Sequence, residues 1–191
     1  MSVNTGNLIM GPGTLNKGVF GAVEPADTAV ATVPDPLVWT DVGGTSDGVE
    51  IAIDQDYTQL EVDQIVDIPE RRLTKREATL KTNLAEATLD NLALAMNGAT
   101  LATGGVGATA FQSLSPVNTS SASQVIYSAL LFDGFAPNGK PRRVIGRKML
   151  NTKPVEFAYS KKNQTVYSVF FSAHYVSASV ASFKAIDGAA A

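Results

Sequence analysis

Acidic side chains are the residues of this sequence whose types and spacing come closest to catalytic chemistry. Glu61, Asp63 and Asp67 stand at odd-numbered positions of a predicted strand, and so share one face of it. Two neighbouring carboxylates can serve as acid and base, or as acid and nucleophile, in glycoside hydrolysis. Acids that share a strand face are far more often solvated surface charge, and we favour that interpretation here.

Other catalytic and metal-binding patterns are incomplete. Residues 54–58 begin like a calcium-binding loop, but Ile65 stands at the twelfth position, where such a loop needs Glu. The single histidine, His174, lies in an apolar run, which favours a buried or interface position over a general base. The chain has no Cys and no GxxxxGK[ST] phosphate-binding loop. We therefore expect no enzymatic activity, no catalytic residue, no cofactor and no metal site.

Composition indicates a globular protein with a substantial core. Of the 191 residues, 45% are hydrophobic and 17% are charged, which fits one domain or two small ones. No stretch approaches the roughly 18 apolar residues of a membrane-spanning helix, and the N-terminus lacks the pattern of a secretory signal. We expect a soluble protein made in a reducing cytoplasm. The net charge of −3 disfavours a domain dedicated to gripping nucleic acid.

Charge is strongly segregated along the chain. Residues 41–70 hold nine acids and no Lys or Arg, and a basic segment, 71–76, follows at once. Residues 140–162 hold eight bases and one acid. This second basic segment could contact nucleic acid, but it contains no recognition helix. Opposite charge on opposite edges of a domain suits head-to-tail contact between copies, which can close into a ring.

Period-two alternation predicts a β-rich domain. We divide the chain into an N-terminal arm with loops (1–37), a single β domain (38–186) and a C-terminal tail (187–191). In the stretch that ends at Pro69, the even-numbered residues from Thr58 to Ile68 are expected to face the core. The predicted strands are 49–54, 57–68, 73–82, 125–132, 142–151, 155–159 and 165–176.

One α-helix is predicted at about 83–97. Asn83 can cap it, Glu86 resembles the third position of a capping box, and apolar residues then recur at helical spacing up to Met96. Residues 99–123 are rich in Gly, Ser and Thr, and we expect a long loop that can hold a short strand near 108–114. The fold class is mainly β, a sandwich or barrel with one flanking α-helix.

Three segments in a fixed order resemble the tail tube (major tail) proteins of long-tailed bacteriophages. They are GGTSDGVEI at 43–51, VDQIVDIP at 62–69 and REATLKTNLAEATLDNLALAMNG at 76–98, within about the middle 55 residues. The resemblance implies a β-sandwich-like fold of the tail tube type with a flanking helix. It also implies that six copies form a ring whose inner wall is a continuous β-barrel.

The same resemblance implies the function and the partners. Rings stack into a tube that conducts double-stranded DNA from capsid to host, without sequence-specific binding. The partners are further copies of the chain, a tape-measure protein, a tail terminator and tail-tip proteins. The protein would be assembled in the bacterial host cytoplasm and reside in the virion tail. The family has no catalytic residues or cofactor.

Roles for individual residues follow from this resemblance and from charge. DNA slides more freely past acidic side chains than past basic ones, so we expect Glu61, Asp63 and Asp67 to face the lumen or its rim. Ring stacking is assigned to Ile68, Pro69 and Glu70, together with the N-terminal arm. Contacts between subunits are assigned to Arg71, Arg72, Arg76, Arg142, Arg143 and Arg147.

Three other functions stay open at this point. A head decoration or joining protein of a phage would also be β-rich and lack an active site. A hydrolase would use two of Glu61, Asp63 and Asp67. A small-ligand-binding barrel would be monomeric and stabilised by its ligand.

Overall fold

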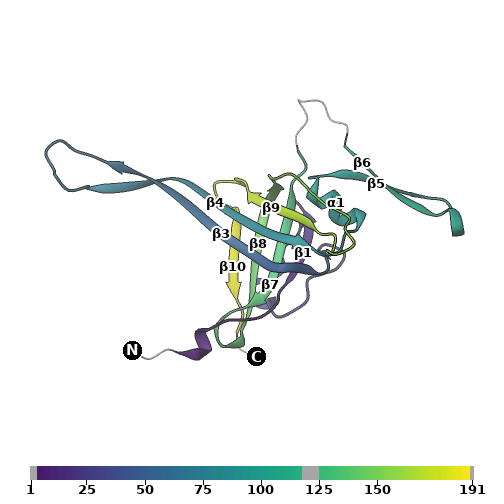
Figure 1. Cartoon of the computed structure of the whole chain (residues 1–191). Helices are drawn as coiled ribbons and strands as arrows, with labels where there is room; N and C mark the ends of the chain where they lie inside the picture. The colour runs from purple at the N-terminus through teal and green to yellow at the C-terminus, as the bar shows by residue number, and fades with distance from the viewer. Residues whose placement is uncertain (1–3, 118–124, 190–191) are drawn as a thin grey trace.

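The computed structural model describes residues 4–117 and 125–189, and this part of the chain is mainly β (Figure 1). An eight-stranded antiparallel sheet has the order β2-β1-β7-β8-β9-β4-β3, with β10 paired to β8, and β5 and β6 form a separate hairpin. The strands are β1 (Thr14–Val19), β2 (Thr40–Asp41), β3 (Thr45–Leu60), β4 (Glu70–Leu84), β5 (Ala99–Gly104), β6 (Phe111–Pro116), β7 (Ser128–Phe135), β8 (Pro141–Asn151), β9 (Tyr167–Ala173) and β10 (Phe183–Asp187). The α-helix is α1 (Leu89–Ala95), and 3-10 turns lie at Thr5–Asn7, Asp27–Ala29, Gly107–Thr109 and Pro137–Gly139. The predicted fold class, mainly β with one flanking α-helix, is confirmed for the described residues.

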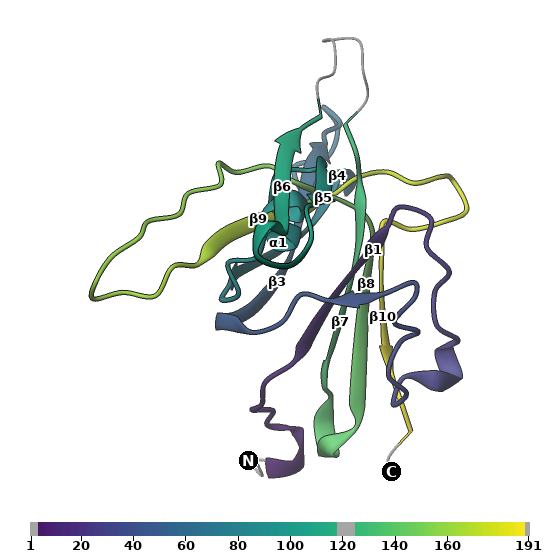
Figure 2. The same ribbon diagram turned by 90° about the vertical axis from the view of Figure 1, so that its right-hand side faces the viewer.

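The sheet divides at β8. One edge of β8 pairs with β7, whereas the other edge pairs first with β10, at Arg142 to Gly146, and then with β9, at Met149 to Asn151. The strands β9, β4 and β3 therefore leave the sheet in a different direction from β10, as Figure 2 shows. The long β3–β4 hairpin is mounted on the body through this branch.

Two apolar clusters lie on opposite faces of β7. Leu130 belongs to the larger cluster, with Leu80, Leu84 and Phe171. Leu131 points the other way, into a smaller cluster around Trp39. In β9, which lies within the strand predicted at 165–176, Tyr167, Val169 and Phe171 are all buried. Strand β7 is therefore buried on both faces and anchors the body.

Cations on β8 and β10 hold the segment 20–39 against the smaller cluster. The Arg143 side chain is 1% exposed and binds both oxygens of Asp133, with nitrogen–oxygen distances of 2.6 and 2.8 Å. It also donates to the carbonyl oxygens of Ala29 and Thr32, at 3.2 and 2.8 Å. Further ion pairs join Arg147 to Glu24 and Lys184 to Asp27. The segment is thus fastened to the sheet at several points, and β1 of the predicted N-terminal arm belongs to the sheet itself.

The helix and the following loop differ from their predicted forms. Helix α1 begins after Thr88, whose hydroxyl accepts from the Asn91 amide at 3.2 Å, so the predicted start at Asn83 is wrong. Asn83 still belongs to β4, and Glu86 accepts a hydrogen bond from the Gly44 amide instead of capping a helix. The predicted loop at 99–123 holds the β5–β6 hairpin up to Pro116, and its part at 118–123 lies outside the described residues.

Two strand predictions also need correction. Residues 155–159 form no strand, although Phe157 packs edge-to-face on Tyr167. The strand predicted at 57–68 ends at Leu60, and β10 was not predicted. The alternation near the C-terminus is too short and too polar to mark β10 in the sequence.

The ion pair of Arg143 provides a direct test of how the segment 20–39 is held. Replacing Arg143 by Ala leaves the largely buried Asp133 carboxylate without its partner, and we expect a loss of about 3 kcal/mol in the free energy of unfolding. Arg142→Ala is the matched control, because Arg142 and Asp187 are a surface pair; it should cost less than about 1 kcal/mol. Urea denaturation measures both, and equal losses would contradict the assignment.

Candidate functional site

The β3–β4 hairpin projects far beyond the body of the protein (Figure 1). Strand β9 pairs with β4 only from Thr79 to Leu84, so the part of the hairpin beyond this point has no third strand. We call residues 53–78 the arm. Strand β3 pairs with β4 alone, which leaves its whole outer edge free in the described structure.

The tip of the arm is a nine-residue connection at 61–69, between the ends of β3 and β4. We expected the even-numbered residues here to face the core, and this is wrong. Val62, Val66 and Ile68 are 45%, 104% and 47% exposed. The alternation correctly indicated two different faces, but it carried no information on whether the same chain covers either face.

One face of the arm carries four apolar residues, two glutamines and two arginines, and no acid. Cross-strand partners share a face of a hairpin, and residues two apart along a strand return to it. The face continues the core side of the sheet, because Leu80 pairs with both Ile51 and Phe171. We call it the apolar face, and its partners along the arm are Ile53 with Ala78, Gln55 with Arg76, Tyr57 with Leu73 and Gln59 with Arg71.

The opposite face carries charges of both signs. Asp54 lies across from Glu77, and Asp56 lies across from Lys75. The Lys75 amine donates to Glu77 at 2.8 Å, which raises the pKa of Lys75. The same hydrogen bond, assisted by one from Ser172, lowers the pKa of Glu77. This charged face is suited to water, whereas the apolar face is not.

An arm of this kind is poorly suited to stand alone in water. A two-stranded ribbon is marginally stable without a third strand or a packed face. Ile53 and Tyr57 on the apolar face are 49% and 52% exposed, and the free edges expose unpaired backbone groups. Large exposed apolar surfaces are often interaction sites. These features make the arm a candidate binding element.

The structure gathers the predicted lumen and stacking residues at one place. Glu61, Asp63 and Asp67 lie in the tip, around a hollow of about 240 Å³ that Ile68 and Pro69 also line. Glu70 begins β4 immediately after it. Their predicted roles remain predictions, but all six residues belong to the part of the chain that lies furthest along the arm.

The six predicted interface arginines fall into two groups. Arg71, Arg72 and Arg76 are exposed on the arm and form no ion pair within the described residues. Arg143 is buried and bound within its own chain, so its predicted contact with a neighbouring subunit is wrong. The charge segregation in the sequence could not reveal this, because partners such as Ala29 are distant along the chain.

The other two arginines of β8 have partners in their own chain. Arg142 binds Asp187 at 2.6 and 2.8 Å, and this hydrogen bonding lowers the pKa of Asp187. Arg147 binds Glu24 and donates to the Ala181 carbonyl oxygen at 2.7 Å. Their positive charge is thus largely used inside the molecule, and their predicted role at an interface stays a prediction.

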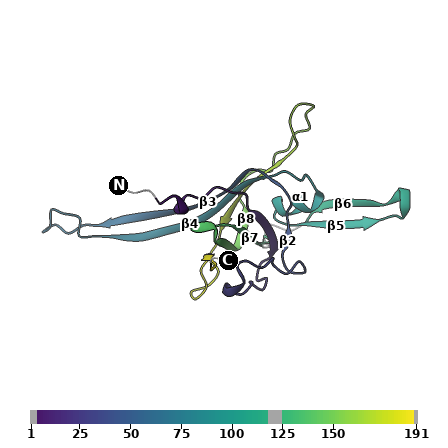
Figure 3. The same cartoon turned by 90° about the horizontal axis from the view of Figure 1, so that it is seen from below.

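A second projecting element was predicted only in part, because the short strand expected near 108–114 overlaps β6 but its pairing with β5 was missed. The β5–β6 hairpin leaves the body on the side opposite to the arm (Figures 1 and 3). Its turn depends on Gly105, which has φ +74°, and a Cβ there would collide with the Thr109 carbonyl oxygen. The pair Gly104–Gly105 between two runs of Ala, Thr and Ser is the turn signal that could have found it.

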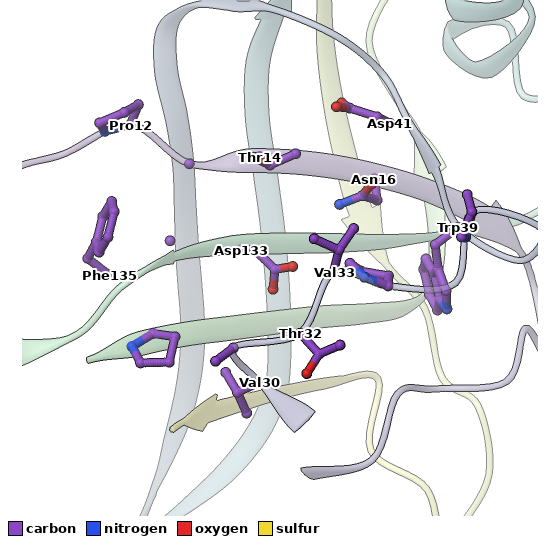
Figure 4. Close-up of a pocket in the computed structure, with 16 residues that line it drawn as sticks. Pro12, Thr14, Asn16, Val30, Thr32, Val33, Trp39, Asp41, Asp133 and Phe135 are labelled. Atoms are coloured by element: carbon purple, nitrogen blue, oxygen red, sulfur yellow. The ribbon is translucent and has the colours of Figure 1, made fainter. Parts of the chain in front are cut away.

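A hollow of about 500 Å³ is an open groove (Figure 4). It lies between β1, the end of β7 and the segment 30–36, and its lining includes Trp39, Phe135 and several prolines. The carboxylates at its edge are Asp41 and Asp133, and Asp133 is already bound to Arg143. The groove therefore presents mainly apolar surface.

The described residues form neither a metal-binding cluster nor a membrane-spanning helix. Within residues 4–117 and 125–189, no three His, Asp or Glu side chains converge as they would around a metal ion. No helix in this part of the chain has the length and hydropathy needed to cross a bilayer.

No known protein-family model matches the sequence, and no curated protein is significantly similar to it.

Because no third described strand pairs with the arm, its removal should leave the body intact. A variant that joins Gln55 to Arg76 through Asn-Gly, in place of residues 56–75, closes the ribbon at an existing cross-strand pair. We expect its melting temperature to stay within about 4 °C of the full-length protein, or about 1 kcal/mol. A larger loss, measured by circular dichroism, would show that the arm supports the body.

Proposed function

We propose that this protein is the structural subunit of a phage tail tube. Copies would assemble head-to-tail into hexameric rings, and rings would stack into a hollow tube that conducts double-stranded DNA. The observation that carries the proposal is the arm, whose apolar face and free edges have no cover among the described residues. The order of the three segments that resemble tail tube proteins supplies the particular assembly.

The dimensions of the arm support a contact between copies. The eight residues from Ile53 to Leu60 span roughly 25 Å at about 3.3 Å per residue. An element of this length reaches well into a neighbouring copy. The outer edge of β3 runs through 16 residues and can accept a further strand, as closure of a barrel from several chains requires.

The acids of the tip support a passive conduit. Glu61, Asp63 and Asp67 would repel the phosphates of DNA if they face the lumen, and this keeps DNA free to slide. The remaining parts of the proposal come from the resemblance: a tape-measure protein, a tail terminator and tail-tip proteins as partners, assembly in the host cytoplasm, residence in the virion tail, and no enzymatic activity.

Electron microscopy of the purified protein tests the assembly. We expect negative-stain images of concentrated wild-type protein to show hollow tubes with six-fold end views, and the arm-shortened variant to remain as separate subunits. The arm-shortened variant must first be shown to fold. Closed shells or isolated trimers of the wild type would favour a head decoration or joining protein instead.

A charge reversal tests the lumen assignment. The variant E61K/D63K should form tubes that retain short duplex DNA at low salt and release it as salt rises. The retained DNA should resist a nuclease, because it lies inside the tube. D54K/D56K, on the charged face of the arm, makes the same change in charge and should retain no protected DNA. Equal protection of DNA by both variants would contradict the placement of the tip in the lumen.

A further inference from the structure

One face of the arm and the opposite end of the β3–β4 hairpin carry opposite charge, although the arm as a whole holds seven acids and four bases. At the arm, Arg71 and Arg76 lie on the apolar face, which has no acid among its cross-strand partners from Gln55 to Gln59. At the other end, where Thr45 pairs with Leu84, stand Asp47, Glu86 and Asp90. We call this the base end. Because β3 has 16 residues, the two ends are roughly 50 Å apart.

The acids of the base end have mostly neutral partners. The Asp47 carboxylate accepts from the Asn83 amide at 2.9 Å, and Glu86 accepts from the Gly44 amide at 3.0 Å. Asp90 lies 3.5 Å from the side-chain nitrogen of Gln112. Among the described residues none of these three carboxylates lies within 4.0 Å of a Lys or Arg nitrogen.

One cation lies close to these acids. The Lys17 amine donates to the backbone carbonyl oxygen of Asp90 at 3.0 Å. Burial lowers the pKa of Lys17, and the nearby Asp90 carboxylate partly opposes this. A half-buried lysine bound to a backbone oxygen compensates part of the charge of Asp90, and Glu86 and Asp47 keep theirs. The base end therefore presents net negative charge.

The β5–β6 hairpin extends this end with an uncharged surface. Residues 99–126 contain no Asp, Glu, Lys or Arg, and Phe111 is 57% exposed. Gln112 ties the hairpin to α1 through Asp90. Natural edge strands are usually protected by charge, and this hairpin lacks that protection on both outer edges. It leaves the body opposite to the arm (Figures 1 and 3). In a head-to-tail arrangement of two copies it would point toward the arm of the neighbour.

We propose that the apolar face of the arm binds the base end of a second copy of this chain. Arg71 and Arg76 would face Glu86 and Asp90, while Tyr57 and Leu73 would pack on the uncharged β5–β6 hairpin. This inference rests on the proposed head-to-tail assembly and names the two surfaces that meet. Each copy then offers one arm and one base end, so the contact is heterologous and can repeat.

Charge also defines how far the arm overlaps its partner. The tip acids Glu61, Asp63 and Asp67 are repelled by the acids of the base end, whereas Arg71 and Arg76 are attracted. The arm should therefore extend past the base end until the arginines reach it. A shorter overlap would place like charges together.

Paired charge reversals test this contact. The arm variant R71E/R76E and the base variant E86K/D90K should each raise the concentration needed for assembly by at least roughly tenfold, because like charges then meet. The variant with all four substitutions, R71E/R76E/E86K/D90K, restores opposite charge and should assemble close to the wild-type concentration. Sedimentation velocity measures each, after circular dichroism has shown that every variant folds.

The charged face of the arm provides the matched control. R72E/K75E makes the same change of charge on the same arm, but on the face that would not touch the base end. It should assemble like the wild type, and adding it to E86K/D90K should not rescue assembly. Tubes that form normally from both R71E/R76E and E86K/D90K would overturn the inference and leave the proposed function intact.

Failure of the proposed function would look different. If the wild type forms no tubes, sedimentation velocity of the same variants still reports pairwise association. Association that is lost in each double reversal and regained with all four substitutions supports the contact. Association that ignores these charges, or a wild type that stays monomeric at high concentration, overturns it.

Discussion

The rest of the structure depends on the point along β4, between Ala78 and Thr79, at which pairing with β9 ends. From Thr79 to Leu84, β4 lies between β3 and β9, and one of its faces is part of the core. From Glu70 to Ala78 the same strand has only β3 beside it. Two strands cannot bury both faces and both edges of their own ribbon. The apolar pattern of the core thus continues into a region where no other described strand covers it.

Continuity of β4 joins the arm to a rigid body. Leu84 and Leu80 are buried in the larger cluster, and Glu70 at the other end of the strand is exposed. The body is further fixed by the buried Arg143, which fastens the segment 20–39 to the sheet. An arm mounted on a well-packed sheet is held in one direction at its root, so an assembled neighbour would find it in a defined position.

Local patterns in the sequence predicted where the strands lie more accurately than they predicted which strand residues are buried. The alternation in β9 and the basic run of β8 marked real strands, and charge segregation pointed to the arm as an unusual segment. Sequence periodicity could not show that Val62 and Val66 lack cover, because burial depends on strands far away in the chain. The residues of the candidate site were therefore singled out from the sequence, but some of them were wrongly expected to face the core.

Competing local signals explain the other errors. Asn83 and Glu86 have the spacing of a helix start, but pairing with β3 and β9 keeps Asn83 in a strand and leaves Glu86 to bind Gly44. Arg143 looked like surface charge because its partners lie in two separate segments, β7 and 20–39. The pairing of β5 with β6 escaped notice because small polar residues are equally common in loops.

Amide hydrogen exchange measured before and after assembly tests the central claim most directly, namely that the arm gains its cover from another copy. In the free subunit the amides of β4 from Arg71 to Arg76 should exchange much faster than those from Thr79 to Leu84, which β9 and β3 both flank. In the assembled protein the two groups should exchange at similar, slow rates. An arm that exchanges as fast after assembly as before it would contradict the account.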